Sequence, residues 1–270
     1  MPDKKQIATR EEYNNTTALN FSGSKFLLQS PAHYRAYLAA DREETKPLRM
    51  GTLTHALVLE PDTVPARFAV SVECDRRTKI GKEAFEAFLA ANIGKTTVSP
   101  DEMEVCTRVA DSMVALQKTI GVKFVATELM LLVDYNGVPL KSAIDAVGDD
   151  GFIYDLKTTA DDASPKGFLS SIRSFRYNLQ AYMYRLVYEL YTGQRLNGVR
   201  FIVTEKVEPY CSAVYEIGPE LMSYAVSDFE KVVDLYKTST ALDEWPGYPT
   251  TPQVVDLNAK ASAATPINFA

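Results

Sequence analysis

The alternation of apolar and polar positions predicts helices in the first 120 residues of the chain. The stretch "SPAHYRAYLAADREE" at 30–44 begins with a serine that can cap a helix and a proline suited to its first turn. The segments "LRMGTLTHALVLE" at 48–60 and "GKEAFEAFLAA" at 81–91 are also predicted to be helical. The segment at 99–120 begins with a serine that a glutamate follows three residues later, the pattern of a capping box.

The pattern changes to β-rich runs between residues 123 and 159. Two turn signals divide this region, Asn136-Gly137 and the "DDG" sequence at 149–151. Both are typical of hairpins, because their residues tolerate the positive φ that tight turns require. The region therefore predicts a meander of three antiparallel strands.

A long helix is predicted at 165–192, after the meander. Two more strands follow within 199–217, and a last helix extends from about Pro219 to Lys237. This order of elements predicts an α/β fold in which helices flank a central mixed β-sheet, with extra helices before it.

The domain layout follows from the same pattern. Residues 1–20 are polar and predict a flexible N-terminal segment, and 21–245 form the folded domain. Residues 246–270 are rich in proline, threonine and alanine and predict a flexible tail.

Composition and charge narrow the classes of protein. Apolar residues make up 46% of the 270 residues, enough for a large core, and no apolar run is long enough to span a membrane. Three scattered cysteines argue against a disulfide framework, a zinc site or an iron–sulfur cluster, so we expect a cytoplasmic protein. The net charge of −6 excludes a broadly basic surface but still permits local basic contacts with DNA.

The most distinctive chemistry lies in the sequence "YDLKTT" of the third predicted strand. Asp155 and Lys157 share one face of a strand, while Leu156 points to the other. Asp145 on the preceding strand can converge with them, and two close carboxylates favour a hard cation between them, Mg²⁺ or Mn²⁺. The lysine could then orient or deprotonate a water molecule. The alternative is a surface salt bridge at the end of a strand.

The helix predicted at 165–192 carries two rows of side chains. The apolar row, which predicts a buried stripe, is Phe168, Ile172, Phe175, Leu179, Met183, Leu186 and Leu190. The polar row beside it is Arg173, Arg176, Gln180 and Tyr184. These four side chains can hydrogen-bond DNA phosphates. The alternative is an ordinary solvated face.

Taken in order, these residues resemble the PD-(D/E)xK nuclease superfamily in its RecB-like branch. The motifs that carry the resemblance are His55 on an early helix, Glu128 and Asp145 on successive strands, Asp155 with Lys157, and Gln180 with Tyr184. Within that branch the chain resembles the RecE-type exonucleases (exodeoxyribonuclease VIII) most, in the phrases "PLRMGTLTHALVLEPD" and "DRRTKIGKEAFEAF" and in the "WPGY" at 245–248. The resemblance implies a restriction-endonuclease-like core.

The resemblance also implies a role for each residue. It makes the carboxylates of Asp145 and Asp155 metal ligands, with the Leu156 carbonyl as a further ligand and with Glu128 and His55 supporting or binding the metal. It assigns Lys157 to the attacking water, and Gln180 and Tyr184 to the scissile strand.

The implied activity is a magnesium-dependent exonuclease, with manganese as a second possible metal. It digests one strand of duplex DNA from the 5′ end and leaves 3′ overhangs for recombination by strand annealing. The implied partners are duplex DNA ends, a single-strand annealing recombinase and three further copies of the chain in a ring tetramer, with no membrane. Two alternatives stay open: an endonuclease on the same scaffold, and a non-catalytic module that binds DNA ends or supports a recombinase.

A basic cluster lies outside these motifs, in a predicted loop. Arg76, Arg77 and Lys79 could contact the phosphate backbone, and the alternative is a solvated surface. The "GKT" at 94–96 lacks the earlier glycine of a phosphate-binding loop, so ATP hydrolysis is not expected.

Overall fold

The computed structural model describes residues 4–40, 44–160 and 162–253. The α-helices are α1 (Arg10–Asn15), α2 (Phe21–Gln29), α3 (Pro31–Ala39), α4 (Lys46–Leu59), α5 (Val64–Arg67), α6 (Lys79–Ala91), α7 (Pro100–Thr119), α8 (Pro165–Phe175), α9 (Tyr177–Thr192) and α10 (Pro219–Leu242), with a short 3₁₀ turn, η1 (Pro61–Thr63). The strands are β1 (Lys5–Gln6), β2 (Phe68–Val70), β3 (Thr96–Val98), β4 (Phe124–Tyr135), β5 (Val138–Gly148), β6 (Phe152–Thr159), β7 (Gly198–Glu205) and β8 (Ser212–Glu216).

A mixed sheet of six strands forms the centre of the fold, in the order β1-β4-β5-β6-β7-β8. The strands β4, β5 and β6 form the predicted antiparallel meander. The next strand, β7, runs parallel to β6, and helices α8 and α9 make the crossover between them. All other neighbouring pairs in this sheet are antiparallel.

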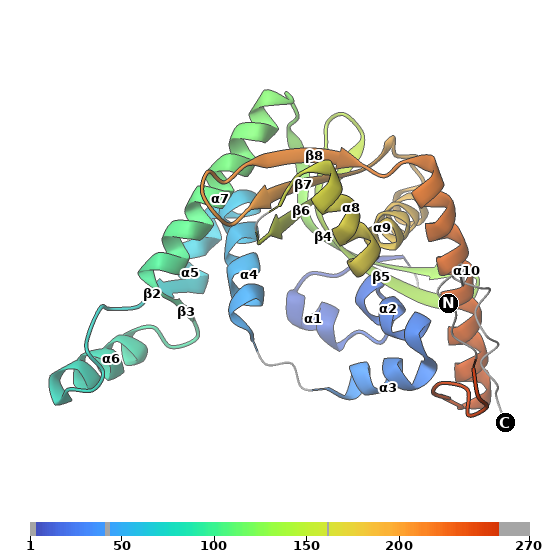
Figure 1. Ribbon diagram of the computed structural model, residues 1–270, viewed down its shortest axis with the longest axis horizontal. Coiled ribbons are helices and arrows are strands. Elements are labelled where there is room, and N and C mark those ends of the chain that lie inside the picture. Colours follow the sequence, from blue (N-terminus) through green and yellow to red (C-terminus); the bar gives the residue numbers. More distant parts are fainter. Residues whose placement is uncertain (1–3, 41–43, 161, 254–270) are drawn as a thin grey trace.

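Helices cover both faces of the sheet (Figure 1). On one face α9 packs against β4, β5 and β7, and α10 and α2 pack against α9. On the other face α7 packs against β7, β8 and α4. The two faces have separate apolar cores, one around Leu179 and Phe229 and the other around Met113 and Leu156. The sheet is therefore the middle layer of a three-layer α/β structure.

The capping box predicted at the start of α7 is present. The Ser99 hydroxyl accepts a hydrogen bond from the Glu102 N–H at 3.1 Å, and the Glu102 carboxylate accepts one from the Ser99 N–H at 3.0 Å. Glu102 also pairs with Arg49 of α4 at 2.7 Å. The cap therefore ties α7 to the helix that carries His55.

The prediction of a single helix at 165–192 is wrong, because the structure has two helices there, α8 and α9. Arg176 adopts a left-handed conformation, with φ of 57°, which ends α8 and starts α9 in a new direction. Its guanidinium pairs with Asp228 of α10 at 2.5 Å. Because of the break, Phe175 is half exposed instead of buried, and the row that contains Arg173 no longer continues into Gln180.

Regular elements lie within the segment 1–20, for which the sequence predicts flexibility. Strand β1 pairs with β4, and Ile7 and Tyr13 are buried against Met130. The buried ammonium of Lys141 holds the end of α1, because it donates to the carbonyls of Tyr13 and Thr16 at 2.6 and 2.7 Å.

The predicted tail, 246–270, falls mostly outside the described residues. Its described part lies against the N-terminal helices: the Ala32 N–H donates to the Pro246 carbonyl at 3.1 Å, and the Gln29 amide donates to the Tyr248 hydroxyl at 2.9 Å.

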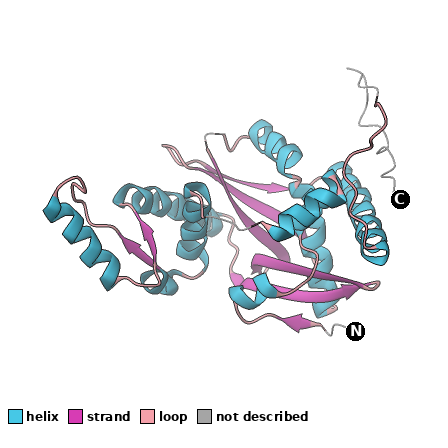
Figure 2. Cartoon of the chain, turned by 90° about the horizontal axis from the view of Figure 1, so that it is seen from below, coloured by secondary structure: helices cyan, strands magenta, loops and turns pink. Residues whose placement is uncertain are grey.

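An arm extends away from the central sheet and is made of β2, β3 and α6 (Figure 2). Strands β2 and β3 are parallel and form a separate two-stranded sheet. Within α6 only Gly81 is buried. None of the helices in the described part of the chain is long and apolar enough to cross a membrane.

Candidate active site

Strands β5 and β6 separate at the two predicted aspartates. The paired residues of these strands are Val147 with Ile153 and Ala146 with Tyr154, and the pairing ends there. The next residue on each strand is an aspartate, Asp145 or Asp155. The Asp145 carboxylate then accepts a hydrogen bond from the backbone N–H of residue 156 at 2.8 Å, in place of a strand partner. Both carboxylates are thus held where the sheet opens.

Asp155 lies at the centre of the predicted D-x-K motif and is almost fully buried. One of its oxygens accepts a hydrogen bond from the Gln180 amide of α9 at 2.8 Å. The other lies 2.5 Å from the ammonium of Lys157, which also packs over the ring of Tyr177. Leu156 points into the core beneath α7, as the alternation of a strand requires.

His55 of α4 reaches the same place from the other side of the opening. Its Nε2 lies 3.1 Å from the Leu156 carbonyl oxygen, which can only accept, so Nε2 carries the proton. In this tautomer Nδ1 has a free lone pair, and it lies 3.6 Å from a carboxylate oxygen of Asp145. The hydrogen bond to Leu156 therefore orients a nitrogen donor toward the aspartate.

Glu128, on β4, is the third carboxylate of the site, beside Asp145 and Asp155. Its backbone has φ of 49°, a conformation that is uncommon for a non-glycine residue and that occurs often at functional sites. This turn of the backbone interrupts the pairing of β4 with β5, between the pairs Thr127–Ala146 and Leu129–Ile144. The Glu128 carboxylate accepts a hydrogen bond from the Arg10 guanidinium of α1 at 2.7 Å.

Burial and mutual repulsion shift the ionisation of these groups. Burial raises the pKa of Glu128 and of Asp145, and it raises the pKa of Asp155 to about 6. Burial also lowers the pKa of His55, which keeps the imidazole neutral. For Lys157 burial acts against the charge, but the two aspartates outweigh it and raise the pKa. The site thus holds an excess of buried carboxyl groups beside one persistent ammonium.

This group of side chains fits a divalent cation. One donor atom each from His55, Glu128 and Asp145 lies within 4.8 Å of the other two. The carboxylate oxygens suit Mg²⁺ or Mn²⁺, the neutral imidazole adds a nitrogen donor of the kind transition metals accept, and a cation there would offset the cost of ionising buried acids. Nearby, the Oε1 atom of Gln180 is buried and has no hydrogen-bond partner among the described residues. That orphaned acceptor is the kind of atom that a cation or its bound water satisfies.

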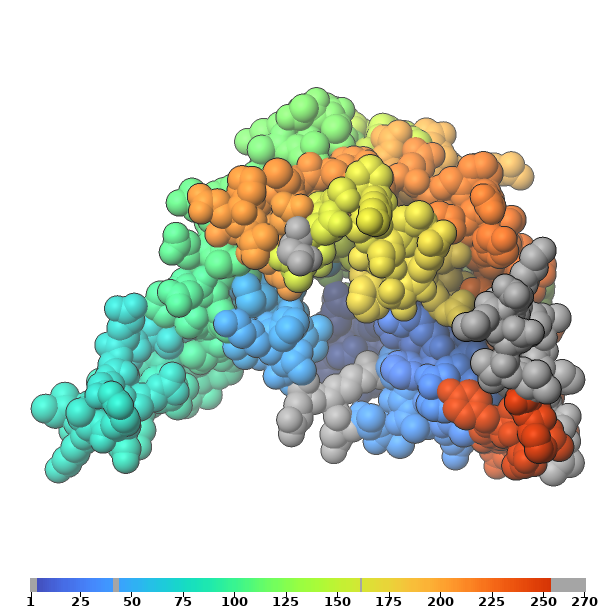
Figure 3. Space-filling view, in the orientation of Figure 1, coloured from blue at the N-terminus to red at the C-terminus, as the bar shows by residue number. Residues whose placement is uncertain are grey.

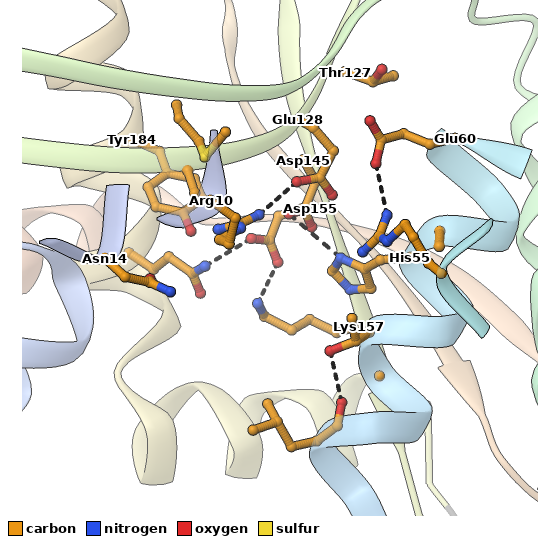
Figure 4. A pocket seen from close by; sticks show the side chains of 18 of the residues that line it. Arg10, Asn14, His55, Glu60, Thr127, Glu128, Asp145, Asp155, Lys157 and Tyr184 are labelled. Atoms are coloured by element: carbon orange, nitrogen blue, oxygen red, sulfur yellow. Dashed lines mark hydrogen bonds and ion pairs between the residues drawn. The ribbon is translucent and has the colours of Figure 1, made fainter. Parts of the chain in front are cut away.

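The group lines a cavity of about 940 Å³ between α4, α1 and α9. Figure 3 shows the surface hollowed beside α4, and Figure 4 shows the side chains that point into the hollow. Tyr184 of α9 lies on the wall near Asn14 (Figure 4). Burial raises the pKa of Tyr184 well above its ordinary value, so it stays a neutral phenol that can donate a hydrogen bond.

The structure brings together the residues of the predicted motifs. His55, Glu128, Asp145, Asp155, Lys157, Gln180 and Tyr184 all line this one cavity. The roles of Asp155 and of the Leu156 carbonyl as metal ligands stay predictions. In the structure these oxygens face Gln180, Lys157 and the His55 imidazole.

The predicted DNA-binding arginines and lysine lie outside the cavity. Arg173 is exposed on α8, and Arg176 is held by its ion pair with α10. Arg76, Arg77 and Lys79 lie at the base of α6 on the arm. Arg76 packs over the ring of a phenylalanine of α6, and Arg77 pairs with an aspartate two residues before it.

Several residues of the cavity were not predicted from sequence, among them Arg10, Asn14, Glu60 and Arg67. Arg10 and Asn14 come from α1, which no apolar periodicity had indicated. Glu60 and Arg67 form an ion pair at 3.0 Å at the end of α4. Glu60 and Arg67 lie on either side of Pro61 in the sequence, but oppositely charged residues at such a spacing are too common to predict a site.

Comparison with known proteins agrees with this geometry. Residues 20–257 match the family described as "PDDEXK-like domain of unknown function (DUF3799)". A solved structure from Eubacterium rectale, described as a "Putative exonuclease", superposes with a TM-score of 0.58 at 12% sequence identity, over 87% of this chain and 88% of that one. Another, described as SSO0001, covers 80% of this chain and 87% of its own, with 16% identity and a TM-score of only 0.27, which supports no argument.

A search of curated proteins finds no match. The mixed sheet with its flanking helices and the Eubacterium rectale structure confirm the expected restriction-endonuclease-like α/β fold. Because the family match extends over most of the chain, the protein belongs to the family of PDDEXK-like domains.

Proposed function

We propose that this protein is a metal-dependent nuclease that hydrolyses phosphodiester bonds of duplex DNA from its ends. The observation that carries the proposal is the meeting of Asp145, Asp155 and Lys157 with His55 and Glu128 in one cavity. An exposed salt bridge at the end of a strand, the alternative for the D-x-K sequence, does not fit. Asp155 is almost fully buried, and most of the Lys157 side chain is buried too.

The residues of the cavity divide the work of hydrolysis. Asp145, His55 and Glu128 would hold the cation, with Asp155 as a further ligand when Lys157 turns to substrate. The cation supplies Lewis-acid polarisation of the phosphate and lowers the pKa of water. Because its own pKa is raised, Lys157 stays protonated at neutral pH. As an ammonium it would orient the attacking water and stabilise negative charge on the phosphate.

The strand to be cut would lie along α9. Gln180 is fixed by its hydrogen bond to Asp155, so its position is coupled to the acidic centre. Tyr184 is one helical turn further along the same face and can donate to a phosphate oxygen. Together they would set the scissile phosphate beside Lys157.

The finer features of the proposal rest on the resemblance to RecE-type exonucleases. They are the use of Mg²⁺, with Mn²⁺ as a second metal, 5′-to-3′ polarity, 3′ overhangs for strand annealing, an annealing recombinase as partner, and a ring tetramer. The similarity to a structure described as a "Putative exonuclease" supports an exonuclease over an endonuclease.

The test is digestion of linear duplex DNA labelled at either end, with Mg²⁺, with Mn²⁺ and with excess EDTA. We expect metal-dependent loss of the 5′ label first, and no cutting of closed circular duplex. Cleavage of the circle would favour an endonuclease. The control is Asp155→Asn, which keeps the size of the side chain and removes its charge. Full digestion in EDTA, or by this variant, would refute the proposal.

A further inference from the structure

The segment before residue 20 belongs to the wall of the active site. It is anchored at several points: β1 pairs with β4, the Ile7 N–H donates to the Met130 carbonyl at 2.8 Å, and Tyr13 is buried. The buried ammonium of Lys141 then holds the carbonyls at the end of α1. The family match begins at residue 20, so this wall lies outside the matched residues.

One face of α1 points into the cavity. Arg10 and Asn14 are four residues apart, so they lie on the same side of the helix, and both line the cavity (Figure 4). Tyr13 lies between them in sequence and faces the core. The anchored helix thus presents a guanidinium and an amide to the same space as the acidic centre.

Arg10 holds one of the three groups that fit a divalent cation. Its guanidinium donates to the Glu128 carboxylate at 2.7 Å, and Glu128 is grouped with His55 and Asp145. A guanidinium and a divalent cation compete for one carboxylate, since both are positive and repel each other at such distances. Arg10 must therefore give up its hydrogen bond to Glu128, in part or in whole, once a cation is bound.

The cost of this loss is small. The Arg10 side chain is 53% exposed and that of Glu128 is 20% exposed, and ion pairs so near to solvent contribute little. A guanidinium freed at the mouth of the cavity then needs an anion. The anion that the proposed function brings there is a phosphodiester, whose two free oxygens match the fork of an arginine.

We propose that Arg10 is a phosphate-positioning residue that exchanges the Glu128 carboxylate for a phosphodiester oxygen of DNA when a divalent cation occupies the acidic centre. This inference rests on the proposed nuclease function. When a cation binds the acidic centre, Arg10 is released from Glu128 and binds the phosphate. Metal binding is thereby coupled to binding of the DNA strand by α1.

The test compares Arg10→Gln with Lys5→Gln. Lys5 is a matched control: it lies on the same segment, its side chain is 56% exposed, it pairs with Glu12, and it does not line the cavity. Three experiments are done on each variant and the wild type: Mn²⁺ affinity by calorimetry without DNA, duplex affinity by fluorescence anisotropy in Ca²⁺, and digestion kinetics, kcat and KM, in Mg²⁺.

The expected result for Arg10→Gln has opposite signs in the two binding measurements. Mn²⁺ binds more tightly, because Glu128 no longer has a competing cation. Duplex DNA binds about tenfold more weakly, because a charged hydrogen bond is lost. Digestion by Arg10→Gln is weakened mainly through a higher KM. Lys5→Gln leaves Mn²⁺ binding and KM unchanged, and Arg10→Lys recovers part of the DNA affinity as a single charge without the fork.

Two results would overturn the inference. If duplex affinity is the same for Arg10→Gln and Lys5→Gln, Arg10 does not touch the phosphate. If Mn²⁺ and DNA affinities fall together, Arg10 only keeps Glu128 in place. Thermal unfolding shows whether each variant is folded, and Arg10→Lys carries the comparison if Arg10→Gln is not. Digestion by the wild type is the separate check on the proposed function, which fails if the wild type cuts no DNA.

Discussion

The Nε2 of His55 donates a hydrogen bond to the carbonyl oxygen of Leu156 at 3.1 Å, across 101 residues of sequence. This bond joins α4 to the strand that carries the D-x-K motif. It also fixes the tautomer of the imidazole and aims Nδ1 at Asp145. Because the proton is on Nε2, Nδ1 keeps its lone pair and can bind a metal.

The first prediction concerns His55. Replacing it by alanine removes the nitrogen donor from the acidic centre, so Mn²⁺ affinity measured by calorimetry is expected to fall by about tenfold or more. The control is His33→Ala, because His33 is the only other histidine in the chain, lies on α3 and hydrogen-bonds to Ser30. Equal Mn²⁺ affinity in the two variants would show that His55 does not bind metal.

The second prediction concerns Lys157. In Lys157→Ala the buried Asp155 loses the ammonium 2.5 Å away, and the attacking water loses the group that orients it. We expect kcat to fall by about a hundredfold or more while circular dichroism shows a folded chain. A variant that digests duplex DNA at the wild-type rate would contradict the role of this lysine.

The third prediction concerns pH and Asp155, whose pKa burial raises to about 6 from the ordinary 3.8. Between these values the folded protein binds more protons than the unfolded chain does. The contribution of Asp155 to stability is therefore lost as pH rises from about 4 to about 6. Without metal, the free energy of unfolding of the wild type should fall over this window relative to Asp155→Asn.

A divalent cation should reverse that effect. It favours the ionised carboxylate, so adding Mn²⁺ at pH 7 should stabilise the wild type more than Asp155→Asn in thermal unfolding. A difference between the two proteins that stays flat with pH, with and without Mn²⁺, would mean that Asp155 ionises as an ordinary surface acid.

Much of the site could be predicted because strand geometry is simple. Alternation places Asp155 and Lys157 on one face, and the Asp149–Gly151 turn sets Asp145 opposite Asp155. The structure has both relationships, with the strands separating at the two aspartates. Helical periodicity likewise placed Gln180 and Tyr184 on one side of a helix, and both line the cavity.

The rest depended on contacts that local patterns do not contain. The break at Arg176 is invisible to periodicity, because a single residue with positive φ redirects the chain without changing the apolar spacing. The N-terminal segment is held by contacts with β4 and by Lys141, all more than 100 residues away in sequence. Short polar segments can form regular elements through such tertiary hydrogen bonds, which composition alone does not reveal.

The fourth prediction concerns the arm. If Arg76, Arg77 and Lys79 bind DNA, replacing all three by serine should weaken duplex affinity in Ca²⁺. The slope of log affinity against log salt should also decrease, by about 0.9 for each phosphate that the arm no longer neutralises. The expected decrease is smaller than the value for three phosphates, since Arg77 is already paired with Asp75. The control is Lys237→Ser on α10, and an unchanged slope in the triple variant would make the arm a solvated surface.

The last prediction concerns Lys141, which is 6% exposed and donates to the carbonyls of Tyr13 and Thr16. In Lys141→Met the side chain still fills the space, but both carbonyls lose their donor, at a cost of about 1–3 kcal/mol for each one that stays buried. Hydrogen exchange in residues 10–16 should therefore become faster, while exchange in β7 stays slow. The control, Lys123→Met, changes an exposed lysine just before β4. If both variants exchange alike in residues 10–16, β1 and the buried Ile7 and Tyr13 are enough to hold α1, and the wall of the cavity does not depend on the lysine.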